Sequence, residues 1–320
     1  MSQIREISAA WNALLDESGC NRALGCAEWY IGNCRARSLT PYVIAAVKDE
    51  RTSGILPLTI DPPSGTLAFP AFVSDYNDAL VYGDDPQLTA DMLRYVLLQM
   101  GTKKIVLSRV RADSTCIKAI PFLERDAHIR CLYREIDTYL YVDLPGTFDD
   151  YLASRSRTFR KSIKRAQRKF EATGFAIREL EPSSFDPYKL PDLFLSLVSA
   201  RHKENCSITR NPRTTTFVRE VVPTAFSTGK LRAFAIFDGD RIIALDMCLV
   251  GADGLGAWQG GFLDEAEDWS PGMVLFAHGI REAINTRLKE YDFLKGDEEY
   301  KRHWANNSRA ICEMEIVTNR

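Results

Sequence analysis

Two patterns of hydrophobic and polar positions divide the chain near its middle. In the first part, the polar segment 48–53 separates two apolar runs, which is typical of a β-hairpin with a longer loop. Farther on, apolar residues recur at helical spacing until Gly101, and β-rich segments follow. The elements expected here are strands over 41–47 and 54–60, a helix over 90–100, and strands over 104–107 and 132–144. They predict a β-rich core with helices packed on it.

A different pattern begins at Pro145-Gly146. Thr147 is a candidate N-cap for a helix through Leu152, because its hydroxyl can accept a hydrogen bond from a backbone N–H. Asp238-Gly239-Asp240 indicates a hairpin between two β runs. The other expected elements are helices over 156–172, 190–203, 214–226, 273–288 and 297–304, and strands over 231–237, 241–250, 255–262, 291–294 and 310–317. This order predicts an α+β fold with two domains, residues 1–145 and 146–320.

Composition indicates a globular protein that buries a sizeable core, since 45% of the 320 residues are hydrophobic and 26% are charged. The first residues lack the apolar segment of a signal peptide, and no apolar run reaches the roughly 18 residues of a membrane span. Eight cysteines form no C-x-x-C pair, and four histidines show no H-E-x-x-H pattern. We therefore expect a cytoplasmic protein with reduced thiols, no membrane span and no metal site.

The end of the chain contains SPGMVLFAHGIREA, from Ser270, followed by YDFLKGDEEYKRHWA, from Tyr291. Together with SRSRTFRKSIKRAQRKF, from Ser154, these segments resemble the GNAT-type acyltransferases, and more closely their FemABX-like branch of cytoplasmic acyl and aminoacyl transferases. The resemblance is clearest over 149–316. It implies tandem GNAT-like domains, each a mixed, mostly antiparallel sheet flanked by helices, with the N-terminal one degenerate. It also implies no tightly bound cofactor, and acyl-CoA, acyl-carrier protein or aminoacyl-tRNA as co-substrate.

One segment departs from the family pattern. GNAT enzymes that use coenzyme A usually carry a Gln/Arg-x-x-Gly-x-Gly/Ala loop before the equivalent helix, whereas this chain has Glu267 and Asp268 there, and these acids would repel a pyrophosphate. The helix start at Ser270, Gly272 and Met273 still offers N–H groups and the positive end of the helix dipole, worth about 0.3–1 kcal/mol to an anion. An ordinary helix start, with no ligand, explains the same residues equally well.

Lys301 and Asp246 are the candidate catalytic residues. The resemblance implies that Lys301 lies near the substrate, where an ammonium group would stabilise a developing oxyanion, whereas a solvated lysine is the alternative. Asp246 shares a strand face with Ala244 and Cys248, where burial would raise its pKa toward that of a general base. The alternative for Asp246 is an ion pair with Arg232 on the neighbouring strand.

Six further residues are candidates for substrate binding: Asp75, Tyr76, Trp258, Gln259, Lys295 and Tyr300. Asp75 and Tyr76 lie in a turn-rich segment, where they could hold an amine, although turns are commonly made of such residues. Trp258 and Gln259 begin a Trp-Gln-Gly-Gly segment that could line a cleft. Tyr300 is adjacent to Lys301, and Lys295, at a strand end, is the second candidate for the cationic role.

A basic helix gives the strongest charge signal. The net charge is only −2, yet residues 155–169 hold eight Lys or Arg and no acid. Five of these residues share one face of the predicted helix and form what we call the basic stripe: Arg157, Lys161, Lys164, Arg165 and Arg168. An unneutralised stripe indicates a polyanionic partner, either tRNA, an acidic carrier protein or a nucleotide-linked substrate. The alternative is a solvated face balanced by the acids of 264–268.

Taken with the resemblance, these residues predict an N-acyltransferase that moves an acyl group from acyl-CoA or acyl-carrier protein to the amine of a small-molecule acceptor. An aminoacyl-tRNA-dependent, amide-forming transferase and a non-catalytic GNAT-like binding module are the alternatives. We expect Asp246, Lys301 and the helix start at Pro271 to meet in one groove.

Overall fold

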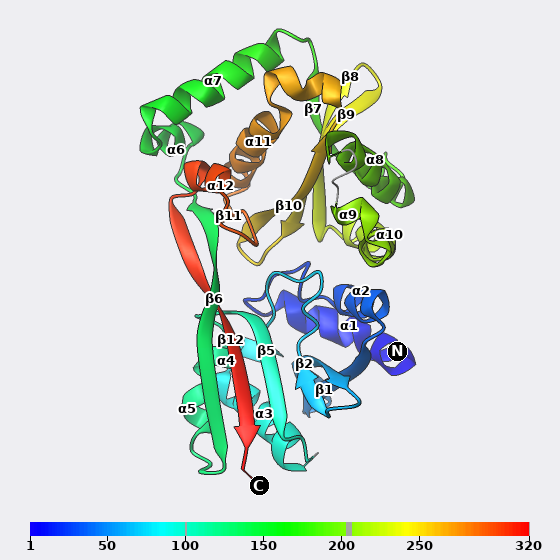
Figure 1. The fold of residues 1–320 in the computed structure, drawn as a ribbon, viewed down its shortest axis with the longest axis vertical. Coiled ribbons are helices and arrows are strands. Elements are labelled where there is room, and N and C mark those ends of the chain that lie inside the picture. Colours follow the sequence, from blue (N-terminus) through cyan, green and yellow to red (C-terminus); the bar gives the residue numbers. More distant parts are fainter. Residues whose placement is uncertain (100, 203–206, 320) are drawn as a thin grey trace. The chain divides into compact units, whose positions relative to one another are not determined.

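The computed structural model describes residues 1–99, 101–202 and 207–319, which form two compact units (Figure 1). Unit 1 comprises Met1–Thr138 and the end of the chain from Arg309, and unit 2 comprises Tyr139–Ser308. The chain leaves unit 1 within strand β6 (Ile129–Asp143) and returns to it within strand β12 (Asn307–Thr318). The last strand of the chain therefore belongs to the unit that the first residues form.

Unit 1 is a mixed, mostly antiparallel sheet with helices. Its strands run in the order β1-β2-β3-β5-β12-β6, and β4 pairs with β2. The pairing of β3 with β5 is parallel, whereas β1, β2 and β12 make antiparallel pairs. Its other elements are α1 (Ser2–Asp16), α2 (Ala27–Arg37), β1 (Thr40–Lys48), β2 (Arg51–Asp61), β3 (Thr66–Ala68), β4 (Leu80–Val81), η1 (Tyr82–Asp84), α3 (Pro86–Gln99), β5 (Lys104–Arg111), α4 (Thr115–Lys118) and α5 (Ile120–Leu123).

The core of unit 1 forms where α3 packs on the sheet. Leu93 and Val96 of α3 are fully buried together with Leu56 of β2. Ile105 and Leu107 of β5 join the same cluster, because residues two apart on a strand point to the same face. The helical spacing in α3 and the alternation in β5 thus bury one continuous apolar surface.

The strands of unit 2 are hydrogen-bonded in the order β6-β11-β10-β9-β8-β7. β10 and β11 are parallel, and the neighbouring pairs are antiparallel. Its elements are α6 (Phe148–Ser154), α7 (Arg157–Glu171), β7 (Ala176–Leu180), η2 (Pro187–Lys189), α8 (Leu190–His202), α9 (Ser207–Arg210), α10 (Pro212–Ser227), β8 (Leu231–Asp238), β9 (Arg241–Val250), β10 (Gly254–Phe262), η4 (Asp264–Trp269), α11 (Pro271–Asn285), β11 (Glu290–Asp292) and α12 (Glu299–Trp304).

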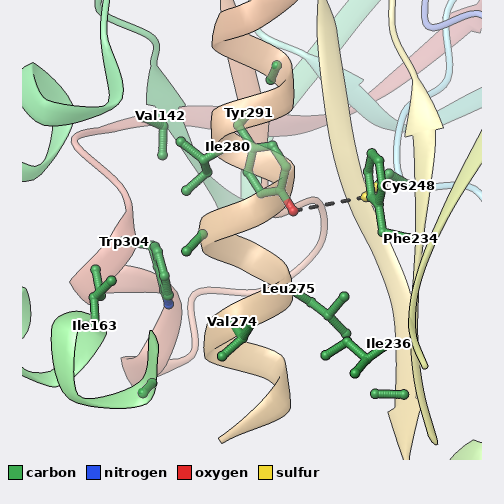
Figure 2. Packing of buried hydrophobic residues seen from close by; sticks show 14 of the residues in the cluster. Val142, Ile163, Phe234, Ile236, Cys248, Val274, Leu275, Ile280, Tyr291 and Trp304 are labelled. Carbon is green, nitrogen blue, oxygen red and sulfur yellow. Dashed lines mark hydrogen bonds between the residues drawn. The ribbon is translucent and has the colours of Figure 1, made fainter. Parts of the chain in front are cut away.

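Helices α11 and α8 cover opposite faces of this sheet. Leu275 of α11 lies in one buried cluster with Cys248 of β9 (Figure 2). Gly261 of β10 lies opposite Leu245 of β9, so it faces the side away from Cys248. There the backbone of α8 comes so close that a Cβ atom at Gly261 would lie 2.6 Å from the nitrogen of Val198. Glycine at this position is therefore a packing requirement.

The predicted fold class is confirmed, and most of its elements are present. Thr147 caps α6 as predicted, since its hydroxyl accepts a hydrogen bond from the Asp150 N–H at 3.1 Å. The two predicted hairpins are β1-β2 and β8-β9. The pattern missed α1, α2 and β7. The predicted domain division between residues 145 and 146 stays a prediction.

Several predicted element ends are wrong, and two elements of unit 2 end two or three residues early. The strand expected over 291–294 ends at Asp292, because Leu294 adopts a left-handed backbone with φ +55°. The helix expected over 273–288 ends at Asn285. The end of the helix expected over 190–203 lies outside the described residues. Within the described ranges, no helix is both long enough and apolar enough to cross a membrane.

Gly261→Ala is expected to lower the free energy of unfolding by about 1–3 kcal/mol, because the added methyl group would overlap the backbone of α8. Gly146→Ala is the matched control, since a Cβ atom at Gly146 meets nothing within 4 Å. Urea unfolding followed by circular dichroism measures both. Equal stability of the two variants would contradict the close approach of α8 to β10.

Candidate functional site

The parallel strands β10 and β11 of unit 2 pair for three residues and then separate. The paired positions are Gly254 with Glu290, Leu255 with Tyr291, and Gly256 with Asp292. β11 ends there, whereas β10 continues along β9 to Phe262. On the side of β11, this second half of β10 has no strand partner among the described residues. Because an open strand edge presents N–H and C=O groups, the separation point is a candidate site for an extended ligand.

Leu294 turns the chain away from β10 at this point. Its φ of +55° is unusual for a bulky residue. Its buried side chain lies over Gly256, where a Cβ atom would come within 3.1 Å of Leu294 Cδ2. The Leu294 N–H donates a hydrogen bond to Asp292 Oδ1 at 2.7 Å. Together these contacts prevent β11 from continuing beside β10.

Asp246 lies in the middle of β9 and is buried, with 4% of its surface exposed. The Cys248 thiol donates a hydrogen bond to Asp246 Oδ2 at 3.5 Å, and the Tyr291 phenol also hydrogen-bonds to the carboxyl group. Burial raises the pKa of Asp246 to about 7, and the two hydrogen bonds oppose this rise. A carboxyl group with this pKa gains and loses its proton near neutral pH, which suits a general base.

The alternative prediction for Asp246, an ion pair with Arg232, is wrong. The guanidinium group of Arg232 donates two hydrogen bonds to Glu179 on β7, both at 2.6 Å. Asp246 instead contacts two neutral donors, because burial raises the pKa values of the Cys248 thiol and the Tyr291 phenol well above their ordinary range. The expectation that Asp246 is not a free surface charge is confirmed.

Sequence reasoning missed Tyr291 as a partner of this cluster. Its phenol oxygen lies 4.0 Å from Cys248 Sγ (Figure 2) and fills the space that the absent side chain of Gly279 leaves on α11, where a Cβ atom would lie 2.8 Å away. The spacing of Asp246 and Cys248 already placed those two on one strand face. Only the pairing of β10 with β11 brings Tyr291 to them.

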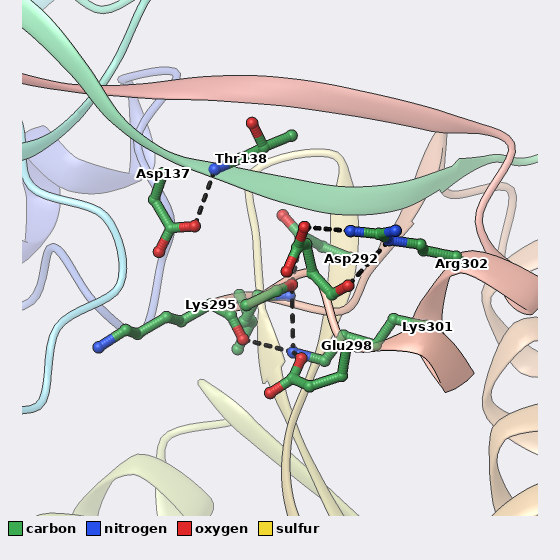
Figure 3. Close-up of polar contacts among 10 residues, drawn as sticks. Asp137, Thr138, Asp292, Lys295, Glu298, Lys301 and Arg302 are labelled. Atoms are coloured by element: carbon green, nitrogen blue, oxygen red, sulfur yellow. Dashed lines mark hydrogen bonds and ion pairs between the residues drawn. The ribbon is translucent and has the colours of Figure 1, made fainter.

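Lys301 of α12 is buried, with 7% of its side chain exposed, so the predicted alternative of a solvated lysine is wrong. Its Nζ donates to the carbonyl oxygens of Lys295 and Gly296 and pairs with Glu298 Oε2 at 2.9 Å (Figure 3). These three acceptors match the three protons of an ammonium group. The oxyanion role of Lys301 stays a prediction, and in this conformation all its protons are directed to the loop.

The residues around Lys301 divide into one exposed cation and an aromatic cluster. The Lys295 side chain is exposed and points away from Lys301 and Glu298 (Figure 3). Tyr300 is 49% exposed and stacks on Phe276 of α11 with ring centroids 6.1 Å apart. Phe276 also packs edge-on against Phe293 and Trp304. This cluster fixes α12 against α11 beside the loop that carries Lys295.

Trp258 lies in a β-bulge of β10. The register with β9 shifts between Ala257 and Gln259, which makes Trp258 the extra residue. Its ring stacks on Phe194 of α8 with centroids 6.4 Å apart. Trp258 thus packs on α8, and the predicted substrate contact of Trp258 and Gln259 stays a prediction.

Helix α11 starts beside negative charge. Ser270 precedes it with φ +59° and makes no side-chain cap, while its carbonyl oxygen accepts a hydrogen bond from the Met273 N–H at 2.9 Å. Gly272 faces open space, since a Cβ atom there meets nothing within 4 Å. Glu267 and Asp268, just before the helix, are exposed. The helix start is accessible, but its surroundings disfavour a pyrophosphate.

Helix α7 docks through its apolar face. Phe159, Ile163 and Ala166 are buried, and Phe159 packs edge-on against Trp304 with centroids 4.9 Å apart. Lys169, at the margin of the helix, donates to the carbonyl oxygen of Asp268 at 2.6 Å. The opposite face of α7 is therefore held outward.

The basic stripe on this outward face is unneutralised. All five side chains are exposed, and within the described part of the chain none of them has a hydrogen-bond or ion-pair partner: Arg157, Lys161, Lys164, Arg165 and Arg168. The alternative, a solvated face balanced by the acids of 264–268, stays a prediction; among these acids, Glu265 pairs with Arg241 at 2.7 Å and the Asp268 carbonyl oxygen accepts a hydrogen bond from Lys169. A polyanionic partner for the stripe likewise stays a prediction.

Asp75 and Tyr76 belong to unit 1, in the loop between β3 and β4. The Ser74 hydroxyl donates to the Tyr76 carbonyl oxygen at 3.1 Å, and the Arg309 guanidinium lies 5.8 Å from the centre of the Tyr76 ring. The segment is a loop, as predicted. The binding role of both residues stays a prediction.

The structure connects the two predicted catalytic residues through β11. Asp246 contacts Tyr291 on that strand, and Lys301 holds the loop that follows it. That these residues share one groove with the helix start at Pro271 stays a prediction. Among the described residues, no three His, Cys, Asp or Glu side chains form a group that could hold a metal ion.

The chain is similar to a known protein family and to several solved structures. Residues 157–302 match the family model of an acetyltransferase (GNAT) domain. The crystal structure of FemX superimposes with a TM-score of 0.71 at 12% identity, over 98% of this chain and 96% of that one. The structure of L-PGS from Bacillus licheniformis gives 0.62 at 11% identity, over 98% and 92%. No curated protein sequence matches the chain.

The chain has a GNAT-like fold, similar to those of FemX and L-PGS. The predicted resemblance is thereby confirmed. A third structure, the C-terminal domain of a putative lysylphosphatidylglycerol synthetase from Agrobacterium fabrum, has a TM-score of 0.60 at 10% identity, over 98% of this chain and 92% of that one. At such low identity these likenesses establish the fold alone, because one fold can carry many different chemistries.

Asp246→Asn is expected to flatten the pH dependence of stability. The pKa of Asp246 is about 7 in the folded protein against an ordinary 3.8, so folding favours its protonated form. Stability from this group is complete below about pH 4 and is lost as the pH rises toward 7, by up to about 1.4 kcal/mol per pH unit. Asparagine cannot ionise, so the variant lacks this loss.

Urea unfolding of wild type and variant at several pH values between about 5 and 8 measures the slope. Asp253→Asn is the control, because this carboxylate is exposed and pairs with Lys289 at the surface. The control should keep the wild-type slope. A wild-type slope in Asp246→Asn as well would contradict the burial of an ionisable group at this site.

Proposed function

We propose that the protein is an amide-forming acyl-group transferase that moves an acyl group from a thioester donor, acyl-CoA or acyl-carrier protein, to the amine of a small-molecule acceptor. The observation that carries this proposal is the separation of β10 from β11 after Gly256 and Asp292. Both donors present the acyl group on a pantetheine arm, an extended chain with amide groups. Such an arm suits the open edge of β10, because its amides can bond to strand N–H and C=O groups.

Asp246 is assigned the role of the base in this reaction. The amine nitrogen bonds to the acyl carbon, the C–S bond breaks, and the proton lost by the amine passes through the base to the leaving thiolate, so that one amide and one thiol form. A base with a pKa of about 7 is partly ionised at neutral pH and can both accept and return that proton. Tyr291 hydrogen-bonds to Asp246 and lies on β11, one residue before the point where β11 separates from β10. This hydrogen bond connects the buried carboxyl group to the separation point.

An aminoacyl-tRNA donor is the second candidate, and two observations favour it. The five unneutralised cations of α7 form a surface suited to a nucleic-acid backbone. Glu267 and Asp268 disfavour the pyrophosphate of coenzyme A at the start of α11. The fold likeness to FemX and L-PGS adds support. In this case the bond that breaks is the ester C–O bond to the tRNA, and the leaving alkoxide oxygen takes up the proton to become a hydroxyl group.

Incubation of the purified protein with mixed acyl-CoAs, acyl-carrier protein, charged tRNAs and candidate amines, followed by mass spectrometry, tests the proposal. An amide product that requires a thioester is expected. Asp246→Asn should lower kcat by about 10²- to 10⁴-fold, because the variant has no base. Asp253→Asn, the exposed control, should keep wild-type kcat.

A product from charged tRNA alone would select the second candidate. Binding of a donor without any product would identify a non-catalytic GNAT-like module and end the proposal. Full activity of Asp246→Asn would remove the assigned base and leave the transferase class intact.

The stripe variant Lys161→Ala/Lys164→Ala/Arg165→Ala separates a tRNA donor from acyl-CoA. For a tRNA donor, the plot of log affinity against log salt concentration should become shallower by up to about 2–3, as expected for three lost phosphate contacts, and KM for charged tRNA should rise. For acyl-CoA, KM should stay unchanged. Stability should not fall, since like charges three or four residues apart destabilise a helix.

The matched control for the stripe variant removes three exposed cations elsewhere in unit 2: Arg219→Gln, Arg241→Gln and Lys289→Gln. Its net charge change is the same. If it weakens tRNA binding as much as the stripe variant does, α7 is not the binding surface.

A further inference from the structure

The loop from Leu294 to Glu298, between β11 and α12, has a backbone that its own sequence does not favour. Leu294 and Gly296 both have positive φ values, +55° and +99°. For leucine this conformation is an outlier that persists only when its surroundings enforce it. At Gly296 a side chain is excluded twice, by the φ value and by Glu298 Oε2, which would lie 2.5 Å from a Cβ atom. The loop is therefore held in a defined shape at the point where β11 leaves β10.

Lys301 supplies the contacts that hold this shape. Its buried ammonium group binds the carbonyl oxygens of Lys295 and Gly296 and the carboxylate of Glu298 (Figure 3). A lysine whose three protons are all used in this way cannot donate to a substrate unless it first releases the loop. The ammonium is also shielded, since 7% of the side chain is exposed. Lys301 is therefore a structural residue that fixes the loop from Leu294 to Glu298.

Lys295 is the cation of this segment that has no acidic partner among the described residues. Arg302 forms an ion pair with Asp297, and Lys301 forms one with Glu298. Lys295 is exposed, and its backbone carbonyl accepts a hydrogen bond from Lys301 while its side chain points away from Lys301 (Figure 3). Two cations of α12 thus pair with acids of the loop, whereas Lys295, the cation of the loop itself, is left without an acidic partner among the described residues.

We propose that Lys295 is the residue that contacts negatively charged oxygen of the reacting donor, and that Lys301 with Glu298 is a positioning pair that fixes the loop carrying it. This inference rests on the proposed acyl transfer. The oxygen is either the oxyanion that forms when the amine adds to the acyl carbonyl or a phosphate oxygen of the donor's carrier. An ammonium group on a pre-shaped loop stabilises either one without reorganisation of the backbone.

Lysine labelling tests the arrangement without relying on turnover. Reductive methylation with formaldehyde and cyanoborohydride, read by mass spectrometry, should modify Lys295 rapidly and leave Lys301 unmodified. Lys289, whose side chain is 77% exposed, is the control for a surface lysine. Coenzyme A in one sample, or deacylated tRNA in another, should slow the labelling of Lys295 and not that of Lys289.

Kinetics of three variants test the separate roles. Lys295→Met should lower activity by about 10²-fold with an unchanged melting temperature. A lower kcat assigns the contact to the oxyanion, and a higher KM with unchanged kcat assigns it to a donor phosphate.

Lys301→Met should lower both activity and melting temperature. In the double variant, Lys301→Met should add little to the loss already caused by Lys295→Met, because a positioning residue acts through the residue that it positions. Lys289→Met is the matched control.

Three results would overturn the inference. These are wild-type kcat and KM in Lys295→Met, rapid labelling of Lys301, or losses that multiply in the double variant. Failure of the proposed function is a different result, namely no product from any donor with the wild-type protein. In that event, protection of Lys295 by coenzyme A or tRNA still supports the contact, and its absence with both probes refutes it.

Discussion

The short pairing of β10 with β11 is the constraint on which the site in unit 2 depends. Gly256 and Asp292 are the last opposed residues, and Leu294 then packs over Gly256 and turns the chain away. Had β11 continued, its backbone would have satisfied the edge of β10 and closed the sheet at this point. The left-handed backbone of Leu294 therefore leaves the second half of β10 with one open edge, in the middle of an otherwise continuous sheet.

Unit 2 contains two buried ionisable groups, Asp246 on β9 and Lys301 on α12, and the protein accommodates them in different ways. Asp246 has only neutral donors around it, so desolvation is relieved by a raised pKa of about 7. Lys301 keeps its charge because a carboxylate and two carbonyl oxygens surround it. One arrangement produces a group that exchanges protons near neutral pH, and the other produces a fixed backbone. This difference in environment is the reason for assigning proton transfer to the first and positioning to the second.

Helix α7 shows how a helix carries a charge pattern that weakens it locally. Its like charges repel one another along one face, while Phe159, Ile163 and Ala166 bury the opposite face and provide the stability. Tertiary packing therefore maintains a surface that the isolated helix would disfavour. A surface maintained in this way suits a polyanionic carrier, such as tRNA or an acidic carrier protein.

Periodicity by itself determined the hairpins, the amphipathic helix α7 and the α+β order, because the residues responsible are neighbours in sequence and their alternation reports directly on burial. The two-residue spacing of Asp246 and Cys248 likewise predicted a buried carboxylate. What the sequence left undecided were contacts between distant segments: Tyr291 rather than Arg232 beside Asp246, and a left-handed Leu294 where the pattern read as strand. Only the folded structure determines which acceptors bind a buried ammonium group. Lys301 donates to a loop carbonyl oxygen six residues away and not to solvent. A buried charge needs such partners, and periodicity does not encode them.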